Sequence, residues 1–600
     1  MINKQLEQIT KNIIERSKPT REAYLERITN HKGKIQRKDL GCANLAHAYA
    51  SIPNYMKEKI KENKESNFAI ISAYNDMLSA HQPFKNYPDI LKQELFKNRA
   101  FGQLAGGTPA MCDGITQGYE GMELSLFSRD VIAMSVAIAL SHNVFDGAFY
   151  LGVCDKIVPG LLIGALSFGY LPSIFIPSGP MTSGISNDEK SKMRQLFAAG
   201  EISRDKLLES EMKSYHDVGT CTFYGTANSN QMLMEFMGLH LPNSAFINPN
   251  TPLREALVKQ AAAHMAQHQV KPIGELLSEK NIINAIIGLM ATGGSTNHTI
   301  HLVAIARAAG IIINWDDFDA LSSITPLLAR VYPNGKADVN QFQAAGGLAF
   351  IINELLENGL LYEDVETIMG RGMRDYTKEP FLINGKLHYQ EGIKTSQEES
   401  ILRSIKNPFS QDGGVKILRG NIGRAVIKTS AIKKEHQIIQ APAIVFHSQQ
   451  EFLQRFQNKE LQKDFIAVLP YQGARANGMP ELHKLTPSLG VLQDQGFKVA
   501  LITDGRMSGA SGKVPAAIHI SPEALLNGNI AKIQDGDMLI LDAKNGRLEA
   551  LIDEQEWKNR KPSKFDKKET FGYGRELFAG FREQSSNAET GAMSFGGYFK

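Results

Sequence analysis

The chain is poor in cysteine, in net charge and in long apolar runs, and each shortage excludes a class of protein. Only four cysteines occur among 600 residues, too few for the disulfide framework of a secreted protein. The formal net charge is +3 and basic residues form only short clusters, which argues against a nucleic-acid-binding surface. The most apolar run, Val131 to Leu140, is too short to cross a bilayer.

These shortages favour one cellular setting. The segment Met1 to Glu7 lacks the apolar core of a signal peptide, and free cysteines are typical of a reducing compartment. We therefore expect a cytoplasmic protein that binds neither nucleic acid nor a membrane. A chain of 600 residues also exceeds what one hydrophobic core usually supports, so two or more domains are expected.

Two regions can be distinguished before residue 391. Residues 1–65 combine many charges with apolar residues at helical spacing, which predicts a helical N-terminal extension, with helices in 3–30 broken at Pro19 and another over 52–66. Residues 66–390 alternate strand and helix patterns. Strands are predicted at 68–73, 147–153 and 173–177, and helices at 130–141 and 159–168. This order is typical of a parallel α/β domain.

The third region, residues 391–600, is β-rich. Gly and Asp turns separate apolar segments that predict strands at 415–418, 425–428, 465–469, 498–502 and 537–541. The predicted fold class is therefore α/β: a helical extension, a large parallel α/β domain and a smaller, barrel-like C-terminal domain of the swivelling β/α kind. Residues 391–407 are predicted to form a linker. The apolar residues of the tail, Met593, Phe595, Tyr598 and Phe599, predict that it docks on the protein.

Thiols stand next to carboxylates at two places in the α/β region. Cys154, Asp155 and Lys156 directly follow a predicted strand, and Cys112 and Asp113 repeat the pairing. Soft sulfur selects zinc or iron–sulfur clusters, whereas carboxylate oxygen selects Mg²⁺ or Mn²⁺. Because ligands gather at the carboxyl ends of strands in open α/β sheets, a site with two inorganic centres is indicated. The alternative is that these cysteines are small buried apolar residues.

Two Gly-rich loops in the C-terminal region are candidates for binding anions. The loop 471–481 ends in Glu481, and the loop 503–513 contains Ser508 and follows a predicted strand. The second loop is not a phosphate-binding P-loop, because Val514 follows Lys513. Ser508 is a candidate nucleophile or base, although a loop serine is more commonly a turn residue.

Five ordered motifs resemble the dihydroxy-acid and 6-phosphogluconate dehydratase family over about residues 66 to 560. They are Cys154-Asp155-Lys156 with Pro159-Gly160, Gly219-Thr220-Cys221 with Thr226-Ala227-Asn228-Ser229, Ala291 to Asn297, Gly478-Met479-Pro480-Glu481, and Thr503 to Gly509. The segments Cys154 to Gly160, Cys221 to Asn228 and Ser508 to Lys513 are most similar to the 6-phosphogluconate branch.

The resemblance implies a hydro-lyase of the Entner–Doudoroff pathway. Enzymes of this branch convert 6-phospho-D-gluconate to 2-dehydro-3-deoxy-6-phospho-D-gluconate and water. An iron–sulfur cluster acts as Lewis acid beside Mg²⁺, and the enzymes are homodimers. By this resemblance, the residues that match the Mg²⁺ ligands of the family are Asp113, Asp155, Glu481 and a carbamylated Lys156. Ser508 matches the serine proposed as the base.

The cluster ligands implied by the resemblance are Cys154 and Cys221, with a four-iron cluster favoured over a two-iron one. The family's two-iron members take a third cysteine from a segment that here reads Tyr74 to Met77 and contains none. Cys112 is the favoured replacement because it adjoins Asp113, and Cys42 is the second candidate.

Two other functions remain open from the sequence. One is a dehydratase with the same site that acts on another sugar acid or on 2,3-dihydroxy acids. The other is an iron–sulfur sensor without turnover. A phosphate contact would separate the substrates, and its unranked candidates are Lys190, Arg424, Arg475, Arg506 and Lys513.

Overall fold

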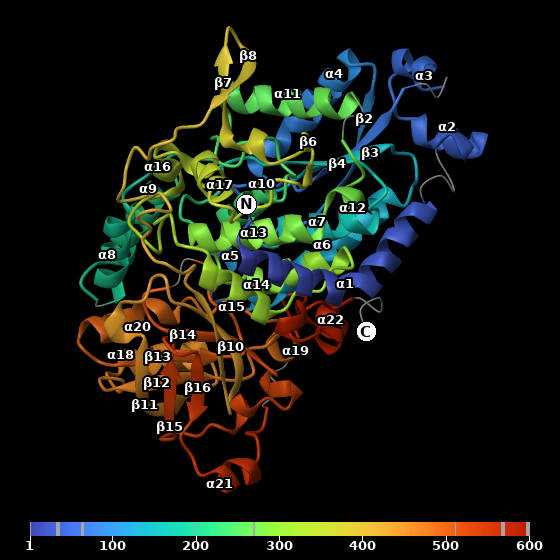
Figure 1. Cartoon of the computed structure of the whole chain (residues 1–600). Coiled ribbons are helices and arrows are strands. Elements are labelled where there is room, and N and C mark those ends of the chain that lie inside the picture. The colour runs from blue at the N-terminus through green and yellow to red at the C-terminus, as the bar shows by residue number, and fades with distance from the viewer. Residues whose placement is uncertain are drawn as a thin grey trace.

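A computed structural model gives the architecture of the protein and describes residues 2–31, 37–61, 65–198, 200–267, 270–509, 512–565 and 571–595. An α/β part lies above a β-barrel in Figure 1, and helices from both lie along the boundary. The predicted fold class, including the helical extension, is confirmed. None of the described helices has the length and apolarity needed to span a membrane.

The N-terminal extension consists of α1 (Lys4–His31), α2 (Cys42–Tyr49) and α3 (Asn54–Lys61). The predicted break at Pro19 is wrong, because α1 continues through this residue. An internal proline costs a helix about 3 kcal/mol, and tertiary contacts on both sides of it offset that cost. Leu6, Ile13 and Ile28 are buried, and Arg21 donates hydrogen bonds to the backbone oxygens of Ala309 and Leu277 at 2.8 and 2.6 Å.

The α/β part is built on a four-stranded parallel sheet in the order β2-β1-β3-β4. Its strands are β1 (Asn67–Ser72), β2 (Phe101–Gly107), β3 (Gly147–Leu151) and β4 (Ser173–Ile176). Every residue of β1, β3 and β4 is buried, as expected for strands covered on both faces. The strands that the sequence predicted at 68–73, 147–153 and 173–177 are therefore confirmed.

Right-handed crossovers decide which helix covers which face. The connection from β1 to β2 runs through α4 (Tyr87–Lys97) toward the β2 edge of the sheet. The connections from β2 to β3 through α6 (Ser125–Leu140) and from β3 to β4 through α7 (Ile157–Ser167) run toward the β4 edge. These two helices therefore pack together on the opposite face of the sheet. The direction changes between β1 and β3, which places a crevice at the carboxyl ends of these two strands. Cys154 follows β3 at this point.

More helices complete the N-terminal part and enclose this crevice. They are α5 (Asp113–Thr116), α8 (Asn187–Ala198), α9 (Arg204–Ser214), α10 (Thr226–Phe236), α11 (Pro252–Ala266), α12 (Ile273–Leu276), α13 (Glu279–Thr292), α14 (His298–Ala308), α15 (Trp315–Ile324), α16 (Val339–Ala344) and α17 (Gly347–Glu357). α10, α13 and α14 are almost entirely buried, which explains their lack of a polar face.

The C-terminal part is a closed barrel in the order β10-β14-β13-β12-β11-β15-β16-β9. Its strands are β9 (Val415–Gly420), β10 (Gly423–Lys428), β11 (Ile438–Val445), β12 (Phe465–Leu469), β13 (Val499–Thr503), β14 (Ala516–Ser521), β15 (Met538–Asp542) and β16 (Arg547–Ala550). Alternate residues such as Ile466 and Val468 or Ala500 and Ile502 form a core of their own, typical of a small filled barrel. β11 to β14 run parallel, with α18 (Gln449–Gln457) and α20 (Leu485–Asp494) between them.

The chain between the two parts is packed rather than free. The hairpin β7 (Lys378–Ile383) and β8 (Lys386–Glu391) ends the N-terminal region. Residues 392–414 then contain no helix or strand, but Leu402 is fully buried and bridges to Ala329. The predicted linker is therefore held against the α/β part along its length.

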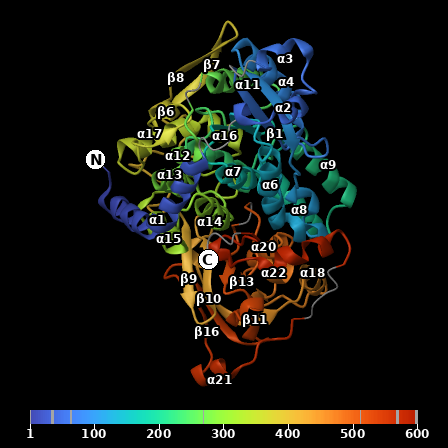
Figure 2. The same ribbon diagram turned by 90° about the vertical axis from the view of Figure 1, so that its right-hand side faces the viewer.

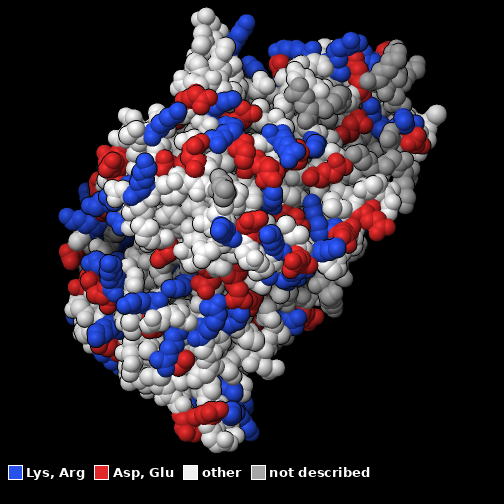
Figure 3. All heavy atoms as spheres, viewed as in Figure 1, with Lys and Arg blue, Asp and Glu red and all other residues white. Residues whose placement is uncertain are grey.

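Acidic and basic side chains are interspersed over the face of the protein seen in Figure 3. No broad patch of one sign covers that face.

The C-terminal tail returns to the α/β part and docks on α6. Arg129 donates to the backbone oxygens of Gly591 and Ala592 at 2.9 and 2.8 Å, and Asp130 accepts two hydrogen bonds from Ser594. Arg129 and Asp130 are completely buried and form an ion pair at 2.8 Å. The predicted docking is confirmed for Met593 and Phe595, while Tyr598 and Phe599 lie outside the described residues.

We predict that Arg129→Met lowers the stability of the protein by about 3–5 kcal/mol, because it leaves a buried carboxylate without its partner. Thermal unfolding measures the loss, and limited proteolysis shows whether the tail is released. Lys558→Met, which breaks an exposed ion pair with Glu554, is the control and should cost at most about 1 kcal/mol. Equal unfolding temperatures for the two variants would contradict the prediction.

Candidate active site

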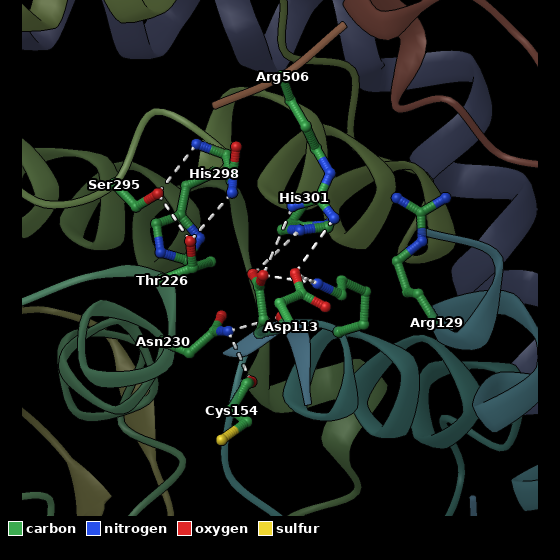
Figure 4. A network of polar contacts seen from close by, with 12 residues as sticks. Asp113, Arg129, Cys154, Thr226, Asn230, Ser295, His298, His301 and Arg506 are labelled. Atoms are coloured by element: carbon green, nitrogen blue, oxygen red, sulfur yellow. Dashed lines mark hydrogen bonds and ion pairs between the residues drawn. The ribbon is translucent and has the colours of Figure 1, made fainter. Parts of the chain in front are cut away.

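Sequence-predicted residues from both parts of the chain meet at one place. The N-terminal part contributes the segments after β2 and β3. The barrel contributes the loops after β12 and β13, which lie at the same end because these strands are parallel. In Figure 4, Arg506 of the barrel approaches Asp113 from one side and Cys154 lies on the other.

Cys154 is held in an uncommon backbone conformation at the end of β3. Its φ angle is +73°, in the left-handed region that costs a non-glycine residue about 1–3 kcal/mol. The Asn230 amide holds this turn by donating to the backbone oxygens of Cys154 and Asp155 at 3.0 and 2.8 Å. Such strain persists only where surrounding structure maintains it, and here it orients three consecutive functional side chains.

The other two thiols come from separate loops. Cys112 directly precedes α5, and its backbone oxygen caps the amides of Ile115 and Thr116. Cys221 follows Gly219, whose φ of +121° and close approach to Met181 leave no room for a side chain. The Asn228 amide donates to the backbone oxygen of Cys221 at 2.6 Å and so fixes the turn.

Cys112, Cys154 and Cys221 lie close enough to affect one another's ionisation. Burial raises the pKa of the Cys154 thiol well above its usual value, and both other thiols raise it further. Burial likewise raises the pKa of Cys221 to about 12, with a contribution from Cys112. Cys42 is exposed at the start of α2, which lies at the right-hand edge in Figure 1 and on the side that faces the viewer in Figure 2. Of the two candidates for a third thiol, only Cys112 is beside the others.

Three carboxylates form a compact group next to the thiols. Asp113, Asp155 and Glu481 each place an oxygen within 4.8 Å of the other two. The Lys156 ammonium contacts Asp113 and lies 2.6 Å from Asp155 Oδ2. Arg506 donates to Glu481 Oε1 at 2.6 Å and to Asp113 Oδ2 at 3.2 Å. Two cations therefore neutralise most of the charge of three buried acids.

The ionisation of the acids reflects this balance. Burial raises the pKa of Asp155, but Lys156 and Arg506 outweigh it and hold this pKa well below its usual value. Burial raises the pKa of Glu481, and repulsion from Asp113 and Asp155 opposes the lowering effect of Arg506. A divalent cation among these oxygens would remove the repulsion and favour the ionised form of all three.

Several polar residues around the acids were not predicted from the sequence. Ser125 donates to Asp113 Oδ1 at 2.5 Å, and Asn297 and Gln117 donate to Glu481 at 3.3 and 3.4 Å. His301 Nε2 lies 3.8 Å from Asp155 Oδ1, which is longer than a hydrogen bond. Asp155 Oδ1 is buried and has no hydrogen-bond partner in the described part of the chain, so one acceptor remains for a ligand.

Ser508 lies on the barrel loop that carries Arg506, next to the start of α10. A side chain at Gly509 would clash with the Thr226 amide and with Ser295. Asn297 connects this contact to the acids by donating to both Thr226 and Glu481. Ser508 also lines a narrow cavity with Thr296, Lys428 and Thr486. Ala510 and Ser511 of the same motif lie outside the described residues.

The five candidates for a phosphate contact differ in their surroundings. Arg506 belongs to the carboxylate group. Lys513 pairs with Asp494, Arg424 pairs with Asp316 and Glu589, and Arg475 donates to the Ser585 backbone. Lys190 is buried 4.9 Å from the centre of the Tyr215 ring, and its charge lowers the pKa of the Cys221 thiol.

Comparison with known proteins gives the same family for both parts of the chain. Residues 65–376 match the profile described as "Dihydroxy-acid/6-phosphogluconate dehydratase N-terminal". Residues 400–592 match the corresponding C-terminal profile. The chain belongs to the dihydroxy-acid/6-phosphogluconate dehydratase family.

Some relatives of the chain are named phosphogluconate dehydratase, and another is named dihydroxy-acid dehydratase. A phosphogluconate dehydratase of Helicobacter pylori (strain J99) is 63% identical, over 98% of this chain and 99% of its own length. The Escherichia coli (strain K12) protein of the same name is 55% identical, with the same coverage. A dihydroxy-acid dehydratase of Hydrogenobaculum is 34% identical over 82% of this chain and 87% of its own length.

This dehydratase family uses an iron–sulfur cluster. The site offers ligands that fit such a group, since three neighbouring thiols supply soft sulfur. The adjacent carboxylates, with the unpartnered Asp155 Oδ1, supply the hard oxygens that suit Mg²⁺.

We predict that Cys112→Ser, Cys154→Ser and Cys221→Ser each lose the brown absorbance of an iron–sulfur cluster together with activity, because each removes one of three neighbouring thiolates. Absorbance spectra of anaerobically purified variants measure the loss. Cys42→Ser, which changes the exposed cysteine, is the control and should retain both properties. Full cluster absorbance in any of the first three variants would exclude that cysteine as a ligand.

Proposed function

We propose that the protein dehydrates 6-phospho-D-gluconate to 2-dehydro-3-deoxy-6-phospho-D-gluconate and water, the reaction of the Entner–Doudoroff pathway. The observation that carries this proposal is the juxtaposition of three thiols with three carboxylates in a chain 55–63% identical to phosphogluconate dehydratases. The dihydroxy-acid relative has a lower identity of 34%, which favours the sugar acid as substrate.

In this proposal Cys112, Cys154 and Cys221 hold a four-iron cluster, and Asp113, Asp155 and Glu481 hold Mg²⁺. A carbamate on Lys156 would add oxygen ligands to the same group, since its nitrogen already lies between two of the acids. When bound, the cluster supplies a Lewis acid for the departing hydroxyl and Mg²⁺ supplies positive charge beside the substrate carboxylate.

Arg506 and Ser508 act from the barrel side. Arg506 orients Glu481 and Asp113 through its two hydrogen bonds. Ser508 takes the proton from the carbon next to the substrate carboxylate, a very weak acid whose removal requires a positioned base. The loop packs closely against Thr226 and Ser295, which fixes the position of Ser508 relative to the acids.

The proposed base Ser508 and the three carboxylates also argue against an iron–sulfur sensor, because a sensor requires neither a base nor a set of acids. We further propose a homodimer. An almost wholly apolar groove of about 330 Å³ reaches Cys112 and is lined by the exposed Met77 and Ile115 and by Phe578; a second copy would cover this surface beside the site.

We predict that the anaerobically purified protein forms a 2-keto acid from 6-phosphogluconate with kcat/KM at least tenfold higher than from gluconate or 2,3-dihydroxyisovalerate. The homology to phosphogluconate dehydratases is the reason for this order. Trapping of the 2-keto product measures each rate. A preference for either unphosphorylated acid would replace the proposed substrate, and no turnover of any would favour the sensor.

We predict that Ser508→Ala retains cluster absorbance but loses turnover by roughly a hundredfold or more, the effect of removing a positioned base. Ser430→Ala is the control. Ser430 follows β10 and donates to Asn334 at 3.0 Å, and none of its hydrogen bonds in the described part of the chain involves the three carboxylates. Near-normal turnover by the Ser508 variant would remove this residue from the mechanism.

A further inference from the structure

Lys428 is a buried lysine that the proposed mechanism does not use. It is the last residue of β10 and only 8% exposed. Its amine donates to the backbone oxygens of Gly293 and Gly294 at 2.9 and 3.2 Å. No carboxylate in the described part of the chain pairs with it. A buried lysine without a counter-ion is costly, and such residues often serve as proton acceptors.

The position of Lys428 links it to Ser508. Both side chains line one narrow cavity of about 30 Å³, together with the hydroxyl-bearing Thr296 and Thr486 and several apolar residues. A space of this size accommodates a water molecule. One water in this cavity is enough to relay a proton between Lys428 and Ser508.

The two backbone contacts suit a neutral amine. A neutral amine has two N–H bonds and one lone pair, whereas an ammonium has three donors. With Gly293 and Gly294 accepting the two N–H bonds, the lone pair of the neutral form is left for a third direction.

We infer that Lys428 accepts the proton of Ser508 and so generates the alkoxide that attacks the substrate C–H bond. This inference rests on the proposed function and on Ser508 as its base.

The step balances in protons and electrons. The Ser508 O–H bond breaks and its proton forms a third N–H bond on Lys428. The alkoxide then takes the C2 proton, which restores the hydroxyl. The C2–H electron pair forms the C2–C3 double bond as the C3–O bond breaks. The Lys428 ammonium returns its proton to water, and a proton from water converts the departing hydroxide into a water molecule. Neither an oxidant nor an external base is therefore consumed.

The electrostatic surroundings of Lys428 are consistent with this role. Burial lowers the pKa of Lys428 to about 7, and no charged neighbour contributes to this shift. The elements around it do carry titratable groups: Lys416 and Arg419 on β9, His519 on β14, Asp494 at the end of α20, and Lys513. None of these interacts with the Lys428 amine. The neutral amine thus becomes available as the pH rises through about 7.

The test is the pH dependence of kcat/KM of the anaerobic holoenzyme with 6-phosphogluconate. The wild type should gain activity about tenfold per pH unit below the pKa of Lys428 and level off above it. Lys428→Arg keeps a cation and its donors, and Lys428→Gln keeps two N–H groups. Neither accepts a proton near neutral pH, so both should lose kcat/KM by roughly a hundredfold or more and lose this limb of the profile.

A second readout separates proton transfer from a structural role. Substrate deuterated at C2 should show a larger isotope effect on kcat/KM with the variants than with the wild type, because C–H cleavage becomes slower. Cluster absorbance and unfolding temperature establish that the variants are folded. Lys416→Arg, on the neighbouring strand, donates to the Lys544 backbone and is the matched control, expected to behave as the wild type.

A wild-type profile that is flat between pH 6 and 8 would overturn the inference without reference to any variant. So would a folded variant with turnover within about threefold of the wild type and an unchanged profile. Wild-type protein without activity on 6-phosphogluconate would instead reject the proposed function, and an active Ser508→Ala would reject the base on which Lys428 acts.

Discussion

Three carboxylates within 4.8 Å of one another, all largely removed from solvent, impose the constraint on which the site depends. Negative charges this close repel strongly in a medium of low dielectric constant, and they remain together only where positive charge is supplied. Lys156 supplies it from the N-terminal part and Arg506 supplies it from the barrel. Lys156 pairs with Asp113 and Asp155 within its own part, while Arg506 pairs with Glu481 in the barrel and also reaches across to Asp113 and Asp155 at 3.2 and 3.6 Å. The interface is therefore specified by electrostatics as well as by apolar packing.

Much of the fold was predictable because its signals are local. The strands at 68–73, 147–153 and 173–177 are continuous apolar runs, and they are fully buried strands in the structure. Closure of the barrel was not predictable in detail, since it requires β9 to pair with β16, more than a hundred residues later. The prediction at Pro19 failed because distant contacts overrode a local signal. The local rule for proline was correct, but contacts with residues near 275 and 310 maintain the helix.

The same distinction applies to the candidate site. Cys154, Asp155 and Lys156 could be found because they are consecutive and follow a strand. Cys112 was preferred to Cys42 for its neighbour Asp113, and the structure brings Cys112 to the other thiols. Arg506 was considered only for phosphate, because its carboxylate partners lie 25 and 393 residues away. Ser125 and His301 have no motif that distinguishes them from ordinary helix residues, and Asn297 lies in a recognised motif that did not reveal its contact with Glu481. The proposed roles of all these residues as ligands, base or proton acceptor stay predictions.

The three neighbouring thiols differ from the oxygen donors in where they come from along the chain. All of them precede residue 222, and Asn228 and Asn230, which fix the turns at Cys221 and Cys154, also belong to the α/β part. The oxygen donors, by contrast, include one from beyond residue 480. The α/β part alone therefore supplies all three thiols, whereas the carboxylate group is complete only when the barrel is in place. In the proposed mechanism, the three cluster ligands thus come from one part of the chain, and the Mg²⁺ ligands come from both.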